Sequence, residues 1–150
     1  MPESSVTSFR FFLPLEPRYG DIDPQRHVNN VAYFRWFEEA RVRYLRHLGL
    51  WDGRDFDRIG VIVAEAGCSF KSPIGWDEQV EIGVATKHIG RKSLHLVYAV
   101  RQVAGGEVRA EGRTILVGYD YDKNHSVPVP EHWRTTIAAF EGWPAGGPPT

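Results

Sequence analysis

The segment DIDPQRHVNN, residues 21–30, gathers side chains that can do chemistry. Asp23 supplies a carboxylate, His27 supplies an imidazole ring, and Asn30 lies where a long apolar segment begins. A carboxylate can act as a nucleophile or as a general base, and the first N–H groups of a helix can polarise a carbonyl oxygen. These groups suit an attack on a carbonyl carbon. The same acid-proline pattern is also typical of a turn that caps a helix, and the residues alone leave both interpretations open.

Residues 31–50 predict the element that must position this loop. Their apolar residues recur at spacings of four, three, four and four, with charged residues between them: Tyr33, Phe37, Ala40, Tyr44 and Leu48. This spacing indicates an amphipathic helix with a wide apolar face. Asn29 or Asn30 would cap its start, and Gly49 would end it.

Four further segments have the alternating or apolar pattern of strands and are separated by turn residues. They are residues 61–72, 78–88, 93–103 and 107–121, and residues 8–15 predict a shorter strand before the loop. Because the four long strands follow one another directly, we expect a meander. In the last strand the apolar parity changes between Val108 and Ile115, which predicts a β-bulge near Gly112. Residues 130–142 predict a short terminal helix, and residues 143–150 a disordered tail.

This order of elements predicts an α+β fold in which an antiparallel sheet wraps around one long central helix. We expect one domain over residues 1–142, because 150 residues suit a single domain and the sequence has no internal repeat. The helix is apolar over more of its surface than one sheet covers. A second copy of the chain, joined through an edge strand, would cover the rest.

Composition excludes several classes of protein. The formal net charge is −1 without a run of Lys or Arg, which argues against nucleic acid as a partner. No segment has the ~18 to 20 apolar residues of a membrane span, so we expect no membrane insertion. The six histidines lack metal-ligand spacing, and the motifs of serine hydrolases and dinucleotide-binding proteins are absent. The lone Cys68 is interpreted as a small apolar strand residue, and it fits a reducing, cytoplasmic location.

The segment RYGDIDPQRHVNNVAYFRWFEEARVRYL resembles the signature of the 4-hydroxybenzoyl-CoA thioesterase branch of the hotdog-fold superfamily. In that signature an aromatic residue and two acids precede a short turn, which leads into a helix with polar positions. The residues that fill these places are Tyr19, Asp21, Asp23, His27, Val28, Asn29, Asn30, Tyr33, Glu39 and Arg41. A second segment, CSFKSPIGWDEQVEI, resembles the strand–Pro–turn–acid–strand segment of the same family. The resemblance covers residues 8–121.

The resemblance implies a hotdog fold, a homodimer or homotetramer with active sites between subunits, and hydrolysis of acyl-CoA thioesters. Coenzyme A is then part of the substrate, and neither a cofactor nor a metal is implied. Asp23 would be the nucleophile or the general base, and the amide near Asn30 would polarise the thioester carbonyl. His27 would touch the acyl group or hold the loop.

Helical geometry, charge and the resemblance together indicate the substrate-binding candidates. Tyr33 points back toward the loop by helical geometry, although packing in the core would explain this tyrosine equally well. Arg91, Lys92 and Ser93 lie in the turn HIGRKS, where they would bind the phosphates of coenzyme A or form a solvated cationic turn.

Two other functions stay open: a non-catalytic acyl-CoA-binding hotdog protein, and a hotdog hydratase or dehydratase. The hydratase pattern D-x-N-P-L-H is absent from the sequence.

Overall fold

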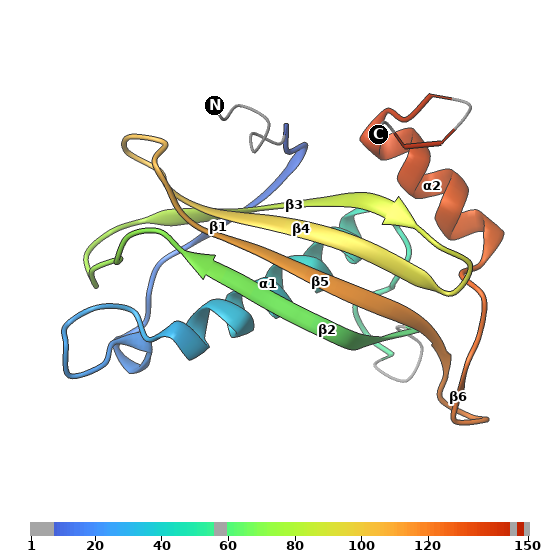
Figure 1. Ribbon diagram of the computed structural model, residues 1–150, viewed down its shortest axis with the longest axis horizontal. Coiled ribbons are helices and arrows are strands. Elements are labelled where there is room, and N and C mark those ends of the chain that lie inside the picture. Colours follow the sequence, from blue (N-terminus) through green and yellow to red (C-terminus); the bar gives the residue numbers. More distant parts are fainter. Residues whose placement is uncertain (1–7, 56–59, 145–146, 149–150) are drawn as a thin grey trace.

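The computed structural model describes residues 8–55, 60–144 and 147–148. In this part of the chain an antiparallel sheet carries one long helix on one face and a shorter helix at one end (Figure 1). The elements follow in the order β1 (Phe11–Leu15), the short 3-10 helix η2 (Tyr19–Asp21), α1 (Asn30–His47), β2 (Val61–Phe70), β3 (Val80–Ile89), β4 (Ser93–Gln102), β5 (Val108–Asp120), β6 (His125–Ser126) and α2 (Glu131–Glu141). The predicted α+β class is confirmed, and so are the predicted helices and strands, within a few residues at their ends.

The strands lie in the order β1-β3-β4-β5-β2, and β6 pairs with β5. Strands β3, β4 and β5 form the expected meander, but the prediction that β2 joins it beside β3 is wrong. β1 already pairs with residues 80–84 of β3, so β2 crosses to the opposite edge and pairs with β5. The outer edge of β2 has no neighbouring strand among the described residues. This edge borders α1 (Figure 1).

Helix α1 packs on the inner face of the sheet through a single apolar stripe. Its buried residues are Ala32, Tyr33, Trp36, Phe37, Ala40, Tyr44 and Leu45. They meet buried side chains of β3, β4 and β5, which include Val84, Leu96 and Leu116. Asn29 caps the helix, and Gly49 follows its end with a φ of 77°, a conformation that costs glycine little. The fixed start of α1 places the preceding loop beside the end of β2.

A glycine lets the helix approach the middle of the sheet. The ring of Phe37 stacks on Tyr98, with centroids 4.6 Å apart, and a Cβ atom at Gly112 would lie 2.4 Å from the Phe37 ring. The irregularity predicted near Gly112 lies three residues earlier. β5 pairs in unbroken register at Gly112, and its register with β4 shifts at Arg109, between the pairs Val100–Ala110 and Arg101–Val108. The parity change in the sequence arises because Ile115 lies on the outer face and is only half-buried, so apolar residues occupy both faces of β5.

Helix α2 closes one end of the core. Trp133 and Ile137 are buried, and the Glu141 carboxylate accepts hydrogen bonds from the Tyr44 hydroxyl and from the Thr86 N–H. Trp143, the first residue of the predicted tail, packs against the core, whereas residues 145–146 and 149–150 of that tail lie outside the described residues. No described helix is long and apolar enough to cross a bilayer.

Candidate active site

The backbone of the loop holds Asp23 in a tight turn. The Asp23 N–H donates to the His27 carbonyl at 3.0 Å, and the Arg26 N–H donates to the Asp23 carbonyl at 2.9 Å. Arg26 takes a φ of 68°, which closes the turn. One carboxylate oxygen of Asp23 accepts from the Gln25 N–H at 2.9 Å, whereas the second oxygen has no partner among the described residues. The half-buried carboxylate is therefore oriented by one bond and has a second oxygen available for chemistry.

Asp21 stabilises the loop and does not line the small pocket that borders Asp23. Its buried carboxylate accepts from the Arg18 N–H at 2.9 Å and pairs with Arg35 of α1 at 3.4 Å. Its carbonyl accepts the Asn29 N–H at 2.7 Å. These contacts tie both ends of the loop to the start of α1, so the two acids of the motif have different surroundings.

The side chain and the carbonyl of Asn29 accept hydrogen bonds from the first turn of α1, but not from the Asn30 N–H. The Asn29 side chain accepts from the Val31 N–H at 2.8 Å, and the Asn29 carbonyl accepts from the Ala32 N–H at 2.9 Å. The Asn30 N–H has no acceptor within residues 8–55, 60–144 and 147–148. The first N–H groups of a helix carry partial positive charge, so this donor suits an anionic or carbonyl oxygen.

A pocket of about 260 Å³ brings the predicted catalytic residues together. Its lining consists of Asp23, Gln25, His27, Val28, Asn30, Tyr33, Phe70, Lys71, Ser72 and Pro73. Asp23, His27, Asn30 and Tyr33 are thus neighbours around one space. Ligand pockets commonly measure ~300 to 1,000 Å³, so this space suits the reacting end of a substrate and leaves the remainder outside.

Tyr33 forms the inner wall of this pocket. Its ring packs between Trp36 and Phe70, with centroid distances of 5.3 and 5.0 Å. Burial raises the pKa of the Tyr33 hydroxyl to about 12, so the hydroxyl stays protonated at neutral pH. Every fully buried polar side-chain atom among the described residues has a hydrogen-bond partner, whereas the Tyr33 hydroxyl has none. The hydroxyl oxygen is therefore not fully buried, and it opens onto the pocket that Tyr33 lines. Tyr33 can therefore donate a hydrogen bond to a bound molecule.

The opposite wall is formed by residues 70–73, of which Phe70, Ser72 and Pro73 were missed by the prediction of site residues. It begins where β2 ends and continues into the loop before β3. The segment CSFKSPIGWDEQVEI does contain it, but nothing local in that segment indicates which residues face the loop of residues 21–30. Cys68 lies nearby on β2, and burial raises the pKa of its thiol to about 11. A thiol that is protonated at neutral pH fits the predicted apolar role.

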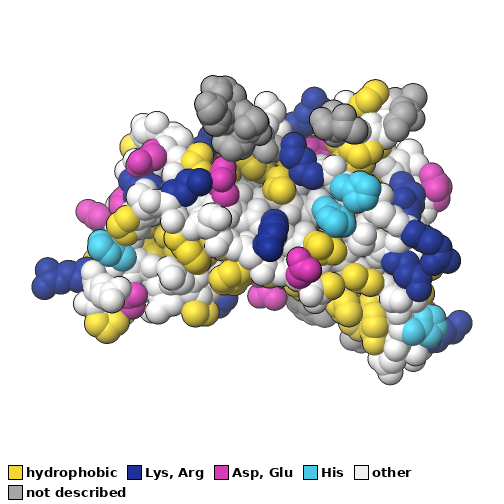
Figure 2. Space-filling model, in the orientation of Figure 1, with side chains coloured by type: hydrophobic (Ala, Val, Ile, Leu, Met, Phe, Trp, Pro, Cys, Tyr) yellow, Lys and Arg dark blue, Asp and Glu magenta, His cyan; other side chains and the backbone are white. Residues whose placement is uncertain are grey.

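The turn with the predicted phosphate ligands lies far from this pocket in the same chain. Arg91, Lys92 and Ser93 follow β3 at the end opposite the loop before β3, and basic side chains cluster over that end (Figure 1 and Figure 2). The Lys92 ammonium donates to the Ser126 hydroxyl at 3.1 Å, and the Ser93 hydroxyl lies 3.4 Å from the His95 ring. One chain therefore does not bring this turn and Asp23 together.

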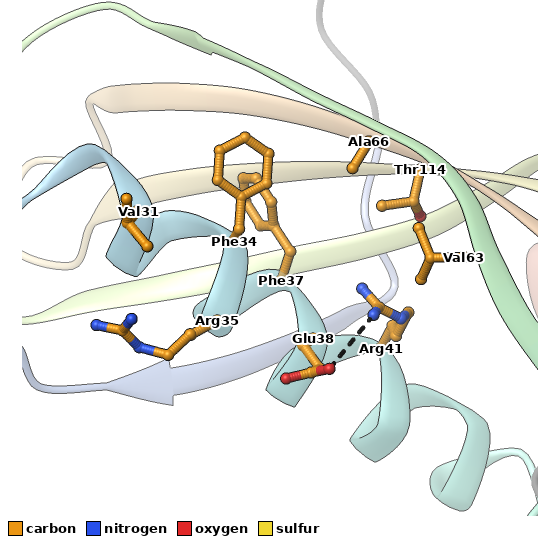
Figure 3. Close-up of a pocket in the computed structure, with 9 residues that line it drawn as sticks. All are labelled: Val31, Phe34, Arg35, Phe37, Glu38, Arg41, Val63, Ala66 and Thr114. Atoms are coloured by element: carbon orange, nitrogen blue, oxygen red, sulfur yellow. Dashed lines mark ion pairs between the residues drawn. The ribbon is translucent and has the colours of Figure 1, made fainter.

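Two further hollows follow the seam between α1 and β2. The first, about 280 Å³, is lined by Val31, Phe34, Arg35, Phe37, Glu38, Arg41, Val63, Ala66 and Thr114. Figure 3 shows that its aromatic rings project from α1 toward the sheet, with the ion pair of Glu38 and Arg41 at its far end. The second hollow, of the same size, continues along the seam past Val63 to Val61. Together they extend from the start of α1 toward its end along the free edge of the sheet.

No group of three or more potential metal ligands occurs among the described side chains. The groups that line the pocket include a carboxylate, a histidine, a tyrosine hydroxyl and a helix N–H, together with the side chains of Lys71 and Ser72.

Known proteins resemble this chain along most of its length. A family model for the thioesterase-like superfamily matches residues 17–137. A crystal structure of a thioesterase from Thermus thermophilus, complexed with coenzyme A and Zn, is 31% identical with a TM-score of 0.80 and covers 91% of this chain and 98% of its own. The uncharacterized protein YsmA of Bacillus subtilis (strain 168) is 28% identical over 131 residues, which are 87% of each chain.

A structure of a 4-hydroxybenzoyl CoA thioesterase mutant complexed with 4-hydroxybenzoyl CoA shares the fold. It is 20% identical with a TM-score of 0.76 and covers 85% of this chain and 97% of its own. These likenesses agree with the predicted architecture, an antiparallel sheet wrapped around one long helix.

Proposed function

The chain belongs to the thioesterase-like superfamily and has its hotdog fold, and we propose that it hydrolyses acyl-CoA thioesters to a free acid and coenzyme A. One observation carries the proposal. The carboxylate of Asp23 and the unpaired N–H of Asn30 border the same small pocket, so a base or nucleophile and an oxyanion donor face one space. A turn that served only to cap the helix would not require such a space between these two groups.

In the general-base route, the Asp23 carboxylate takes a proton from water as the water oxygen attacks the thioester carbonyl carbon. The carbonyl oxygen becomes an anion and accepts the Asn30 N–H. The C–S bond then breaks when the carbonyl re-forms, and the leaving thiolate takes up the proton from Asp23, which gives coenzyme A and restores the carboxylate.

In the nucleophilic route, an Asp23 oxygen attacks the same carbon and expels the thiolate, which leaves a mixed anhydride between Asp23 and the acyl group. Water then hydrolyses the anhydride and restores the carboxylate. The free oxygen of Asp23 serves either route, and both are part of the proposal.

Tyr33 and His27 border the reacting groups. The Tyr33 hydroxyl is protonated at neutral pH, so it can donate a hydrogen bond to the thioester or to a polar substituent of the acyl group. His27 is exposed at the mouth of the pocket, where it can contact the substrate as it enters.

The seam between α1 and β2 suits the acyl chain. The pocket and the first hollow of the seam are lined by neighbouring residues of α1: Asn30 lines the pocket, and Val31 lines the hollow. The aromatic rings of Phe34 and Phe37 offer apolar surface to a hydrocarbon or an aromatic acid. The pocket is too small to hold coenzyme A as well, so the nucleotide end would lie outside it.

A second copy of the chain would complete the site. Among the described residues no strand pairs with the outer edge of β2, and apolar side chains of this strand, including Ile62 and Val63, are exposed. Such an edge suits pairing with another β2 across a two-fold axis. Antiparallel pairing would turn the partner's β3–β4 turn toward this chain's pocket, so Arg91, Lys92 and Ser93 would act on the substrate of the other copy. The homo-oligomer and the cytoplasmic location stay predictions.

The test is thiol release from a panel of aliphatic and aromatic acyl-CoAs, run beside enoyl-CoA and hydroxyacyl-CoA with product analysis. The proposal predicts release of free coenzyme A and no addition or loss of water. Binding of acyl-CoA in calorimetry without thiol release from any member of the panel would favour the non-catalytic binding protein. Hydration of enoyl-CoA would favour the hydratase.

A further inference from the structure

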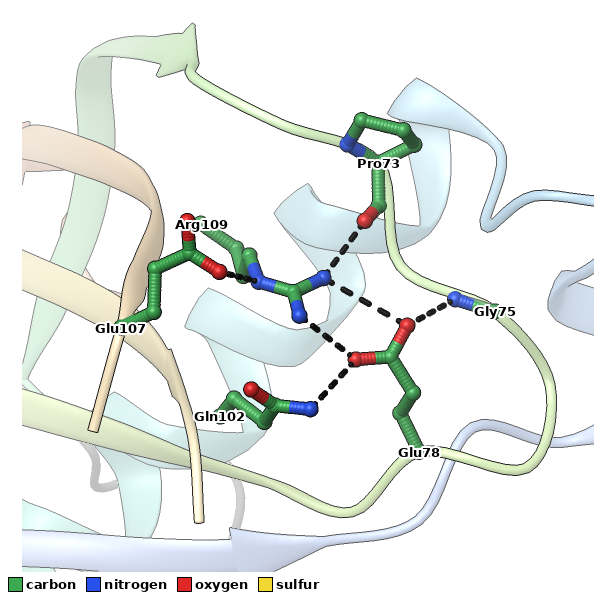
Figure 4. A network of polar contacts seen from close by, with 6 residues as sticks. All are labelled: Pro73, Gly75, Glu78, Gln102, Glu107 and Arg109. Carbon is green, nitrogen blue, oxygen red and sulfur yellow. Dashed lines mark hydrogen bonds and ion pairs between the residues drawn. The ribbon is translucent and has the colours of Figure 1, made fainter. Parts of the chain in front are cut away.

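The ion pair of Arg109 and Glu78, called the charged clamp below, supports residues 70–73, the wall of the pocket opposite the loop of residues 21–30. Arg109 of β5 pairs with Glu78, with its Nη2 at 2.8 Å from one carboxylate oxygen and its Nη1 at 3.4 Å from the other (Figure 4). Nη1 also donates to the Pro73 carbonyl at 2.6 Å, and Nε donates to Glu107 at 2.8 Å. Only 11% of the Arg109 side chain is exposed, which limits screening of these contacts by water.

The clamp holds both ends of the loop between β2 and β3, residues 71–79. At the first end the Arg109 carbonyl accepts from the N–H groups of Lys71 and Ser72, at 2.8 and 3.2 Å. At the second end the Glu78 carboxylate accepts from the Gly75 N–H at 2.8 Å and from the Gln102 side chain at 3.0 Å. The backbone and the side chain of Arg109 therefore hold this loop in place, although the loop is not part of a β-strand.

This loop in turn holds the segment that carries the reacting groups. The Ile74 carbonyl, between Pro73 and Gly75, accepts the Val28 N–H at 2.8 Å. Val28 is buried and lies between His27 and the helix cap, and it pairs with Ile22 across the turn that contains Asp23. A displacement of Ile74 would therefore move the segment that connects Asp23 to the start of α1.

We propose that Arg109 and Glu78 are positioning residues for thioester hydrolysis: their ion pair sets, through Ile74 and Val28, the placement of the Asn30 N–H relative to the Asp23 carboxylate. The inference rests on the proposed function. Neither Arg109 nor Glu78 lines the pocket, so neither contacts the substrate there, and both act through the loop. Their charges also reach Tyr33, where Arg109 lowers and Glu78 raises the pKa of the hydroxyl. Oxyanion donors act only within a narrow range of distances, and a misplacement of about 1 Å can lower a rate by about a hundredfold.

The sheet supplies a matched control. Glu81 of β3 pairs with Arg101 of β4 at 2.7 Å, and the exposed fraction of its side chain, 23%, equals that of Glu78. This pair joins two adjacent strands and touches neither the loop nor the pocket. Glu78→Gln and Glu81→Gln each remove one carboxylate charge from an ion pair with an arginine of the sheet, Glu78 from the loop and Glu81 from β3.

The kinetic test measures kcat and KM for thiol release in both variants and in the wild type. We expect Glu78→Gln to lower kcat by about tenfold to a hundredfold with a smaller change in KM, and Glu81→Gln to leave both constants near the wild-type values. Arg109→Lys, which keeps the charge but loses the fork of donors, should resemble Glu78→Gln. Equal kcat values for Glu78→Gln and Glu81→Gln in folded protein would overturn the proposal.

Amide hydrogen exchange tests the same link without any activity. We expect the Val28 N–H to exchange at least about tenfold faster in Glu78→Gln than in the wild type, and to be unchanged in Glu81→Gln. Unchanged exchange at Val28 in Glu78→Gln would overturn the proposal whether or not the protein hydrolyses thioesters. A wild type that releases no thiol would instead refute the proposed function, and exchange at Val28 would still decide the coupling.

Discussion

Gly112→Ala tests how closely α1 packs on the sheet. A methyl group at this position would lie 2.4 and 2.5 Å from two carbon atoms of the Phe37 ring, whereas ordinary contacts begin near 3.4 Å. Phe37 is buried and its ring is stacked on Tyr98, so it has little room to withdraw. Overpacking of this kind costs about 1 to 3 kcal/mol. The lower entropy of the unfolded chain with alanine returns about 0.4 to 1 kcal/mol.

The net loss expected for Gly112→Ala is therefore about 1 to 2 kcal/mol, which lowers Tm by about 2 to 8 °C in a chain of this length. Urea unfolding at one fixed protein concentration measures it, since assembly makes apparent stability depend on concentration. Gly105→Ala, in an exposed hairpin where the added methyl group meets only an ordinary contact, should change stability little. Adding Phe37→Leu to Gly112→Ala should reduce the penalty, because the ring that clashes is gone. A Gly112→Ala protein as stable as the wild type, or a penalty that Phe37→Leu does not relieve, would refute this account of the packing.

Three further predictions concern the cap, the core and the thiol. Asn29→Ala should lower the unfolding free energy by about 1 kcal/mol in urea titrations, because the Val31 N–H loses its acceptor. Tyr44→Phe should cost about 1 to 3 kcal/mol, since the Glu141 carboxylate loses a buried donor, and a melting temperature equal to the wild type would contradict this. Burial raises the pKa of Cys68 to about 11 from 9.0, so the unfolded chain releases this proton first and stability should fall as pH rises from 9 to 11. Cys68→Ala should flatten that slope in pH-dependent unfolding, and an unchanged slope would count against the burial argument.

The long helix and the individual strands could be predicted because their signals are local. Helical spacing and the asparagine cap of α1 are visible within a few residues of each other, and Asn29 caps the helix as expected. The position of β2 could not be predicted in this way, because it depends on which sheet edge is free after β1 has paired with β3. The position of the β5 bulge was missed by three residues for a related reason: alternation in the sequence does not reveal that both faces of β5 are partly covered.

The residues of the candidate site also differ in whether local sequence could predict them. Asp23, His27, Asn30 and Tyr33 come from one continuous segment, so their proximity follows from a turn and one helical turn. The opposite wall, residues 70–73, and the clamp that holds it lie about 40 to 80 residues further along the chain. Only the folding of the sheet brings them close to the loop of residues 21–30. The role of Arg91, Lys92 and Ser93 stays a prediction, because this turn lies far from Asp23 in the same chain.

The measurement that tests the central claim most directly is the kcat of Asp23→Asn for thiol release from the best acyl-CoA substrate of the wild type. Asp122→Asn, an exposed substitution in the turn between β5 and β6, is the matched control. The account predicts that Asp23→Asn loses at least about a hundredfold in kcat while it still binds acyl-CoA in calorimetry, because the base or nucleophile is removed and the pocket is kept. The control should hydrolyse as the wild type does. If folded Asp23→Asn hydrolyses acyl-CoA at the wild-type rate, the loop of residues 21–30 is a helix-capping turn and the reaction centre lies elsewhere.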